Sequence, residues 1–110
     1  MGLFDFFDMA DNYKERKVAN YSKDGIVIDT CAVSDSDKPF ETGVAHPQYN
    51  DGDWVIVQLY NTKKEAKKGH DKWADIMVNN PPQQLKDVST CAIANMLKDA
   101  DESLVYKRQD

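Results

Sequence analysis

The chain has 110 residues, of which 41% are hydrophobic and 30% are charged, a balance typical of one globular domain. The net charge of −5 argues against a general nucleic-acid binder, because proteins that bind the phosphate backbone are normally basic. No apolar run approaches the ~20 residues of a membrane-spanning helix, and the N-terminal residues lack the basic stretch of a secretory signal. We therefore expect a cytoplasmic protein of one domain, with neither nucleic acid nor membrane as partner.

Residues 1–17 form an arm that begins with large apolar side chains and ends with charged ones. Helical spacing places Leu3, Phe6 and Phe7 on one face, with aspartates between them. Helices that lie on membrane surfaces usually carry Lys and Arg on their polar face, so the aspartates count against a membrane. We expect the arm to dock on the domain's own core or on a protein partner, through Phe4, Phe6 and Phe7.

Three or four consecutive strands follow the arm, with short polar turns and no helix between them. The expected strands cover residues 18–22, 26–33, 40–45 and 54–60. Asp24-Gly25 supplies the positive φ that a tight hairpin turn needs, and Asp51-Gly52 is a second turn signal. Strands joined in this way predict an antiparallel meander rather than a parallel sheet.

The strongest helical pattern covers residues 62–79. Thr62 and Glu65 have the spacing of a capping box, in which each side chain accepts a hydrogen bond from the other residue's backbone N–H. Apolar residues recur at spacings of three and four, which predicts one buried stripe along the helix. Gly69 lies within this stripe and costs helix stability, so we expect it to allow close approach of the helix to the sheet.

The opposite face of this helix is basic. Residues 62–76 contain five lysines and three acidic residues, a net charge of +2 in a chain of −5. Such a face is usually only solvated, but it also suits an acidic protein partner or the acidic face of another copy. We take Lys63, Lys67 and Lys68 as candidate partner-binding residues.

The rest of the chain predicts a smaller helix at about residues 91–99 and a short apolar patch at 104–106, which fits an edge strand or a loose tail. The predicted fold is one α+β domain, in which an antiparallel meander of about four strands is covered on one face by the long helix. Its parts are an arm (1–17), a sheet-and-helix core (18–80) and a C-terminal helix and tail (81–110). The residues expected in the core are Ile26, Ile28, Phe40, Val44, Trp54, Ile56, Leu59, Ala66, His70, Trp73, Met77, Ile93 and Leu97.

Cys31, His46, His70 and Cys91 are the residue types of a Cys2His2 zinc site. Structural zinc sites usually contain a close pair of ligands, whereas no two of these four are nearer than 15 positions in the sequence. The favoured alternative is that both cysteines are reduced, buried hydrophobes and that His70 is a core residue, hydrogen-bonded to a backbone carbonyl or a carboxylate. No phosphate-binding loop, calcium loop or nucleophile–base motif is present, so we expect no enzyme activity, no cofactor and no bound metal.

The chain resembles a group of small uncharacterised proteins from bacteriophages and prophages in two segments, ETGVAHPQYNDG (41–52) and YNTKKEAKKGHDKW (60–73). The corresponding segments of that group read ETxVxHPxYNxG and YxTxEEAxxGHxxW, and Lys64 stands where the group has an acid. The resemblance implies a phage origin and a host-cytoplasm setting, but no reaction. It also implies that Gly69 is a packing position and that His70 is a polar anchor against the loop at 46–52.

Together these patterns predict a non-enzymatic phage or prophage accessory protein that binds another protein, in one version a host protein. Two alternatives stay open. The first is a structural or assembly protein of the virion, and the less favoured second is a small metal-binding protein that uses the four cysteines and histidines. Structural roles are expected for Thr62, Glu65, Gly69, His70, Trp54 and Trp73.

Overall fold

A four-stranded antiparallel sheet with the order β1-β2-β3-β4 forms the body of the protein. The computed structural model describes residues 16–34, 38–89 and 105–109. The four strands are β1 (Lys17–Lys23), β2 (Ile26–Ala32), β3 (Phe40–Ala45) and β4 (Val55–Tyr60). Each strand pairs with the next along the chain, so the predicted meander is confirmed.

The turn between β1 and β2 shows how local sequence sets this topology. Asp24 and Gly25 both have positive φ, 53° and 84°, and Lys23 pairs with Ile26 across the turn. Two consecutive residues with positive φ are typical of hairpin turns whose twist matches that of the strands. The Asp-Gly pair thus fixes the register of the first hairpin.

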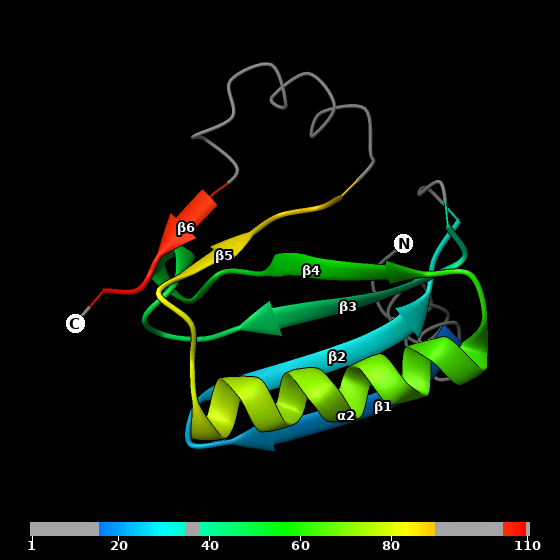
Figure 1. Cartoon of the computed structure of the whole chain (residues 1–110), viewed down its shortest axis with the longest axis horizontal. Coiled ribbons are helices and arrows are strands. Elements are labelled where there is room, and N and C mark those ends of the chain that lie inside the picture. Colours follow the sequence, from blue (N-terminus) through cyan, green and yellow to red (C-terminus); the bar gives the residue numbers. More distant parts are fainter. Residues whose placement is uncertain (1–15, 35–37, 90–104, 110) are drawn as a thin grey trace, which may run out of the picture.

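Helix α2 (Lys63–Asn79) crosses one face of the sheet, in front of the strands in Figure 1. The Thr62 side chain accepts a hydrogen bond of 3.1 Å from the Glu65 backbone N–H, which caps the helix N-terminus. The side of α2 that is buried carries Ala66, Gly69, His70 and Met77. The long helix on one face of the sheet is therefore confirmed. Among the residues that the structure describes, no helix has the length and apolarity to cross a membrane.

A β-bulge in β4 decides which of its residues face α2. Thr42 pairs with Gln58 and the adjacent Gly43 pairs with Ile56, so Val57 is an extra residue in β4. Such an insertion breaks the strict alternation of side chains. Val55, Val57 and Tyr60 are all buried as a result.

The bulge and the start of β4 correct three of the expected core positions. Trp54 precedes β4 and is 47% exposed, so its assignment to the core is wrong. Ile56 and Leu59 are only half-buried, because they pair with Gly43 and Glu41, whose positions face away from α2, whereas Val55, Val57 and Tyr60 are buried.

A second, two-stranded sheet lies beside the free edge of β4. It consists of β5 (Gln84–Lys86) and β6 (Val105–Lys107), which are antiparallel. The Val88 backbone N–H donates to the carbonyl of Ile56 over 2.8 Å, so the chain after β5 continues along β4 (Figure 1). Of the two readings of the C-terminal apolar patch, the strand is confirmed as β6. The smaller helix expected at about 91–99 lies outside the described residues, as do its core positions Ile93 and Leu97.

The hydrophobic core lies between α2 and the sheet. Of the expected core residues, Ile28, Val44, Ala66, His70 and Met77 are buried. Ile26, Phe40 and Trp73 are half-buried. Leu85 of β5 and Tyr49 from the turn after β3 complete the core, and neither was predicted in it.

Candidate functional site

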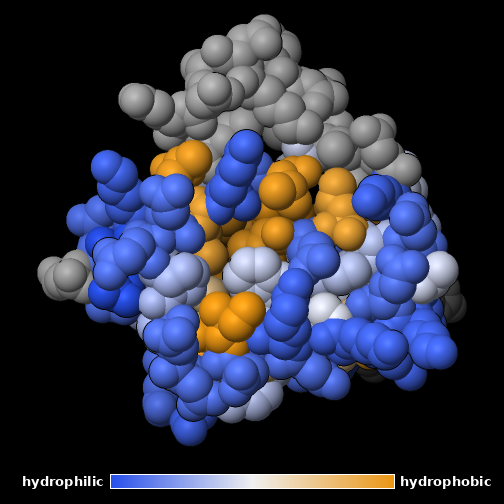
Figure 2. Space-filling model, in the orientation of Figure 1, coloured by the Kyte–Doolittle hydropathy of each residue, from blue (hydrophilic) through white to orange (hydrophobic). Residues whose placement is uncertain are grey.

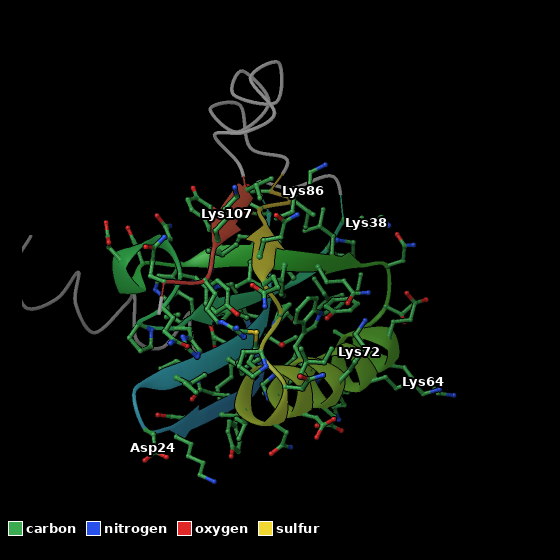
Figure 3. All side chains as sticks on the ribbon, turned by 60° about the vertical axis from the view of Figure 1, so that its left-hand side comes forward. Asp24, Lys38, Lys64, Lys72, Lys86 and Lys107 are labelled. Carbon is green, nitrogen blue, oxygen red and sulfur yellow. The ribbon has the colours of Figure 1, made fainter. Side chains whose placement is uncertain are left out.

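The outer face of α2 carries the candidate partner-binding lysines that the structure describes. Lys63, Lys64, Lys67 and Lys68 are all exposed, because the residues between them turn the apolar side of the helix toward the sheet. Figure 3 shows Lys64 projecting into solvent at one end of α2. Lys72, farther along, instead donates to the Gln58 side chain over 2.9 Å and lies 5.5 Å from the centroid of the Trp73 ring. The four lysines of the first two turns therefore form one solvent-exposed basic surface, which we call the lysine face.

The arrangement of the lysine face opposes helix stability. Lys63 and Lys67, and likewise Lys64 and Lys68, are four residues apart, so like charges lie next to each other on the helix surface. Lys63 and Lys64 also occupy the first turn, where the positive end of the helix dipole disfavours cations. Each effect costs a few tenths of a kcal/mol to about 1 kcal/mol.

The inner face of α2 meets the sheet through a chain of buried hydrogen bonds. His70 Nδ1 lies 2.8 Å from Thr30 Oγ1, which lies 2.6 Å from Thr42 Oγ1. Thr42 Oγ1 lies in turn 2.9 Å from the Tyr60 hydroxyl. All four residues are at most 5% exposed, and no buried side-chain nitrogen or oxygen among the described residues lacks a hydrogen-bond partner. This buried chain joins the helix to three strands and has no access for a substrate.

The hydrogen-bond partner of His70 differs from each one expected. His70 is a polar anchor, but its bond runs to a hydroxyl of β2 rather than to a carbonyl, a carboxylate or the loop at 46–52. The physical reason is the pairing of Thr30 with Thr42, which brings two hydroxyls together beneath the helix.

Gly69 lies where α2 comes closest to β4. A Cβ built at Gly69 would lie only 2.1 Å from the Tyr60 hydroxyl oxygen and 2.3 Å from two carbon atoms of the same ring. Any side chain at position 69 would therefore clash with the Tyr60 ring in its present position. Because Gly69 has no side chain, the helix lies close enough to the sheet for the next residue, His70, to contact the buried hydroxyls.

The second histidine, His46, belongs to a different cluster at the end of β3. Its Nδ1 accepts a hydrogen bond of 3.0 Å from the Gln48 backbone N–H, and its ring meets Tyr49 edge-on at 5.0 Å. The Tyr49 hydroxyl donates to the carbonyl of Pro82, beyond the end of α2. His46 therefore holds a tight turn onto which the C-terminal part of the chain packs.

The positions of these residues do not support the zinc-site hypothesis. Cys31 follows Thr30 in β2 and so points to the sheet face away from His70. Cys91 lies outside the described residues. Within the ranges that the structure describes, no three His, Cys, Asp or Glu side chains gather into a possible metal site.

We predict that acid destabilises the fold through its two histidines. Burial lowers the pKa of His46 below its usual 6.5, and burial also lowers the pKa of His70, an effect that Asp71 and Asp29 oppose in part. At a pH between the folded-state pKa and 6.5, the unfolded chain binds more protons than the folded chain. The free energy of unfolding is therefore highest above pH 6.5 and falls as the pH drops below 6.5. A protonated His46 Nδ1 can no longer accept the Gln48 N–H.

Urea unfolding between pH 8 and pH 5 checks this prediction. We expect the free energy of unfolding to fall below pH 6.5, with a slope of at most about 1.4 kcal/mol per pH unit for each histidine. The control is His46→Gln, which should flatten the slope because one of the two titrating groups is gone. A native slope that the substitution leaves unchanged would contradict the role given to His46.

Two hollows of the described surface bear on the search for a site. The larger, of about 760 Å³, lies between the short 3-10 helix η1 (Asn50–Gly52) and the β5–β6 sheet, and its lining carries amide side chains together with Asp51, Tyr106 and Lys107. The smaller, of about 170 Å³, lies on the sheet face opposite α2, beside Trp54. The lining of the larger hollow contains no cysteine, histidine, serine or threonine, and that of the smaller hollow contains Cys31 with two carboxylates, Asp29 and Glu41, but no histidine.

Sequence reasoning found the lysine face but not the exposed position of Trp54. The glycine at position 43 is the sequence feature that fits the exposed position of Trp54. The indole ring lies against Gly43, where a Cβ would lie 3.2 Å from Trp54 Cε3. Of the other predicted site residues, Phe4, Phe6 and Phe7 lie outside the described part of the chain. Thr62, Glu65, Gly69, His70 and Trp73 all belong to α2 or its cap, and Trp73 Nε1 donates to Gln58 over 2.8 Å.

Comparison with known proteins gives no match to this chain among family models, curated proteins or solved structures.

Proposed function

We propose that the protein is a phage or prophage accessory protein without enzymatic activity, which binds an acidic protein through the lysine face of α2. The observation that carries this proposal is the exposed, closely spaced set of four lysines at Lys63, Lys64, Lys67 and Lys68. The phage setting rests on the resemblance of two segments described above. A host protein is the partner class that we favour.

The energetic argument is that the lysine face lowers the stability of α2 while its side chains make no contact in the core. Its side chains lie outside the core, oppose the helix dipole and repel one another. An acidic partner would relieve this repulsion on binding, and complementary charge would also speed the encounter. The chain as a whole is acidic, so the lysine face gives the molecule a polarity that can orient a partner.

The surface around α2 fits a contact with both polar and apolar parts. Figure 2 shows hydrophilic side chains along α2, and apolar side chains gathered between this helix and the second sheet. Trp73 and Ile76 of α2 are half-buried and pack against the core. Protein interfaces commonly combine an apolar centre with a polar, charged rim.

We predict that Lys64→Gln/Lys68→Gln stabilises the isolated protein. The double substitution removes the 64–68 and 68–72 repulsions and one unfavourable charge in the first helical turn, and it loses the attractions of Lys68 to Glu65 and Asp71. We expect the free energy of unfolding to rise by about 0.5 kcal/mol at low salt, and this gain to shrink at high salt. Urea unfolding at two salt concentrations measures both effects, and a loss of stability would show that these lysines serve the fold.

The functional test is capture of a partner from a lysate of phage-infected host cells, read by mass spectrometry. The native chain should recover one acidic protein in near-equal amount, and Lys64→Gln/Lys68→Gln should not. Lys23→Gln/Lys86→Gln is the matched control, because both lysines are exposed and lie on β1 and β5, away from the lysine face. Figure 3 shows Lys86 at the top of the molecule and Lys64 at the end of α2, at the lower right. Recovery that is equal in all three samples would refute binding through the lysine face, and recovery of virion proteins would move the function to particle assembly.

A further inference from the structure

The sheet face opposite α2 has an apolar centre. Thr30 and Thr42 point toward the helix, so their neighbours Cys31 and Gly43 point to the other face. On that face a hollow of about 170 Å³ is lined by Asp29, Cys31, Glu41, Gly43, Trp54 and Ile56. At 47% exposure, Trp54 is the most exposed large hydrophobic side chain among the described residues. Asp29 and Glu41 are the acidic part of this lining, and the other four residues are its apolar part. Exposed aromatic surface beside such a hollow is typical of a place where another segment packs.

We propose that residues 1–15 of the same chain cover this face, with the aromatic ring of Phe6 or Phe7 in the hollow beside Trp54. This inference is independent of the lysine face, which lies on the other side of the sheet. It gives the apolar N-terminal arm a contact within its own molecule, and thereby decides between the two docking modes that the sequence leaves open.

The start of β1 places the arm next to this face. β1 begins at Lys17, which pairs with Cys31, and Cys31 lines the hollow. Fifteen residues span about 22 Å as a helix and more in an extended form, whereas the four strands span only about 14 Å. The arm is therefore long enough to reach Trp54 from the edge of the sheet.

The chemistry of the arm fits the hollow. Five of its residues between positions 3 and 9 are large and apolar, namely Leu3, Phe4, Phe6, Phe7 and Met9. A cavity of ~150 Å³ accommodates a benzene ring, so the hollow beside Trp54 has the size for one phenyl group. Aromatic rings packed edge-to-face add to the gain from burial.

The arm has an advantage over a second copy of the chain as occupant. Only Arg16 lies between residues 1–15 and β1, so the arm is tethered at the rim of the face that it would cover. Such a tether gives an effective concentration in the millimolar range. A second copy would have to exceed this concentration to compete.

The test is an NMR measurement on the full chain, labelled with ¹³C and ¹⁵N. We expect nuclear Overhauser effects between the ring protons of Phe6 or Phe7 and the Trp54 indole and Ile56 methyl groups. In a mixture of labelled and unlabelled chains, isotope-filtered spectra should lack these signals because the contact is within one molecule. Their absence in the native chain, or their presence in the filtered spectra, would overturn the proposal.

A second measurement follows the Cys31 thiol, in a Cys91→Ser background so that only one cysteine reacts. Phe6→Asp/Phe7→Asp should uncover Cys31 and raise its rate of modification by a small disulfide reagent about tenfold, the factor that corresponds to about 1.4 kcal/mol. Asp5→Asn/Asp8→Asn is the matched control in the same arm and should not raise the rate. Equal rates in all variants would contradict the proposal, and if the first variant fails to fold, the native-chain spectra still decide.

Discussion

Gly69→Ala is expected to lower the free energy of unfolding by about 3 kcal/mol, although alanine is the better helix former by about 1 kcal/mol. The reason is the contact between α2 and β4. The new Cβ would lie 2.1 Å from the Tyr60 hydroxyl oxygen and 2.3 Å from Cε1 and Cζ. Either the helix moves away from the sheet or the ring leaves its place, and each movement breaks the buried hydrogen bonds below His70. Urea unfolding measures the loss.

A second substitution separates this clash from a general effect at the helix centre. Tyr60→Leu removes all three ring atoms that the new Cβ would meet, so Gly69→Ala should cost less in that background by about 1–2 kcal/mol. Tyr60→Phe should bring little relief, since the two ring carbons at 2.3 Å remain. Strictly additive effects of Gly69→Ala and Tyr60→Leu would contradict the close contact.

Thr42→Val is expected to cost about 2 kcal/mol of stability with almost no change of side-chain volume. Thr42 is fully buried, and its hydroxyl contacts those of both Thr30 and Tyr60. Valine keeps the shape but leaves the buried Tyr60 hydroxyl without that partner, and an unsatisfied buried group costs about 1–3 kcal/mol. The measurement is again the free energy of unfolding.

The matching double variant tests the cause directly. Thr42→Val/Tyr60→Phe removes both hydroxyls of the broken bond, so it should be no less stable than Thr42→Val alone. Thr30 keeps its bond to His70 in both variants. Ser22→Val on the exposed edge strand β1 also replaces a hydroxyl residue by valine, but at a solvent-exposed position, and should not lower stability. If the costs of Thr42→Val and Tyr60→Phe simply add, the buried chain does not act as a unit.

The elements of the fold were predictable because each carries a local signal. Asp24-Gly25 specifies a hairpin turn by its backbone preference alone, and Thr62 specifies the start of α2 by its cap. Both signals act over a few residues and need no tertiary context. The meander and the long helix follow from such signals taken in order.

The errors arose where distant strands decide the outcome. The bulge in β4 depends on how Thr42 and Gly43 of β3 pair with β4, and no residue within β4 predicts it. The expected strand at 54–60 is almost continuously apolar, so its sequence did not distinguish Ile56 from the buried Val57. Strand β5, with only three residues, was also too short to show a pattern of its own.

The candidate site was predictable to a different degree. Periodicity places Lys63, Lys67 and Lys68 on the outer face of α2, and the structure exposes all three. The partner of His70 could not be predicted, because Thr30 is 40 positions away and joins it only through the packing of α2 on β2. Trp54 was assigned to the core as the first residue of the apolar strand expected at 54–60, whereas it precedes β4 and is exposed. Aromatic residues are also common at contact surfaces.

The most direct test of binding through the lysine face is the affinity of the captured partner for purified native and Lys64→Gln/Lys68→Gln chains, measured at two salt concentrations. We expect the double substitution to weaken binding at low salt by about tenfold or more, and high salt to weaken the native complex while affecting the variant less. The variant should at the same time be as stable as the native chain or more so, which separates binding from folding. Equal affinities at low salt, or a native affinity that does not respond to salt, would contradict the account.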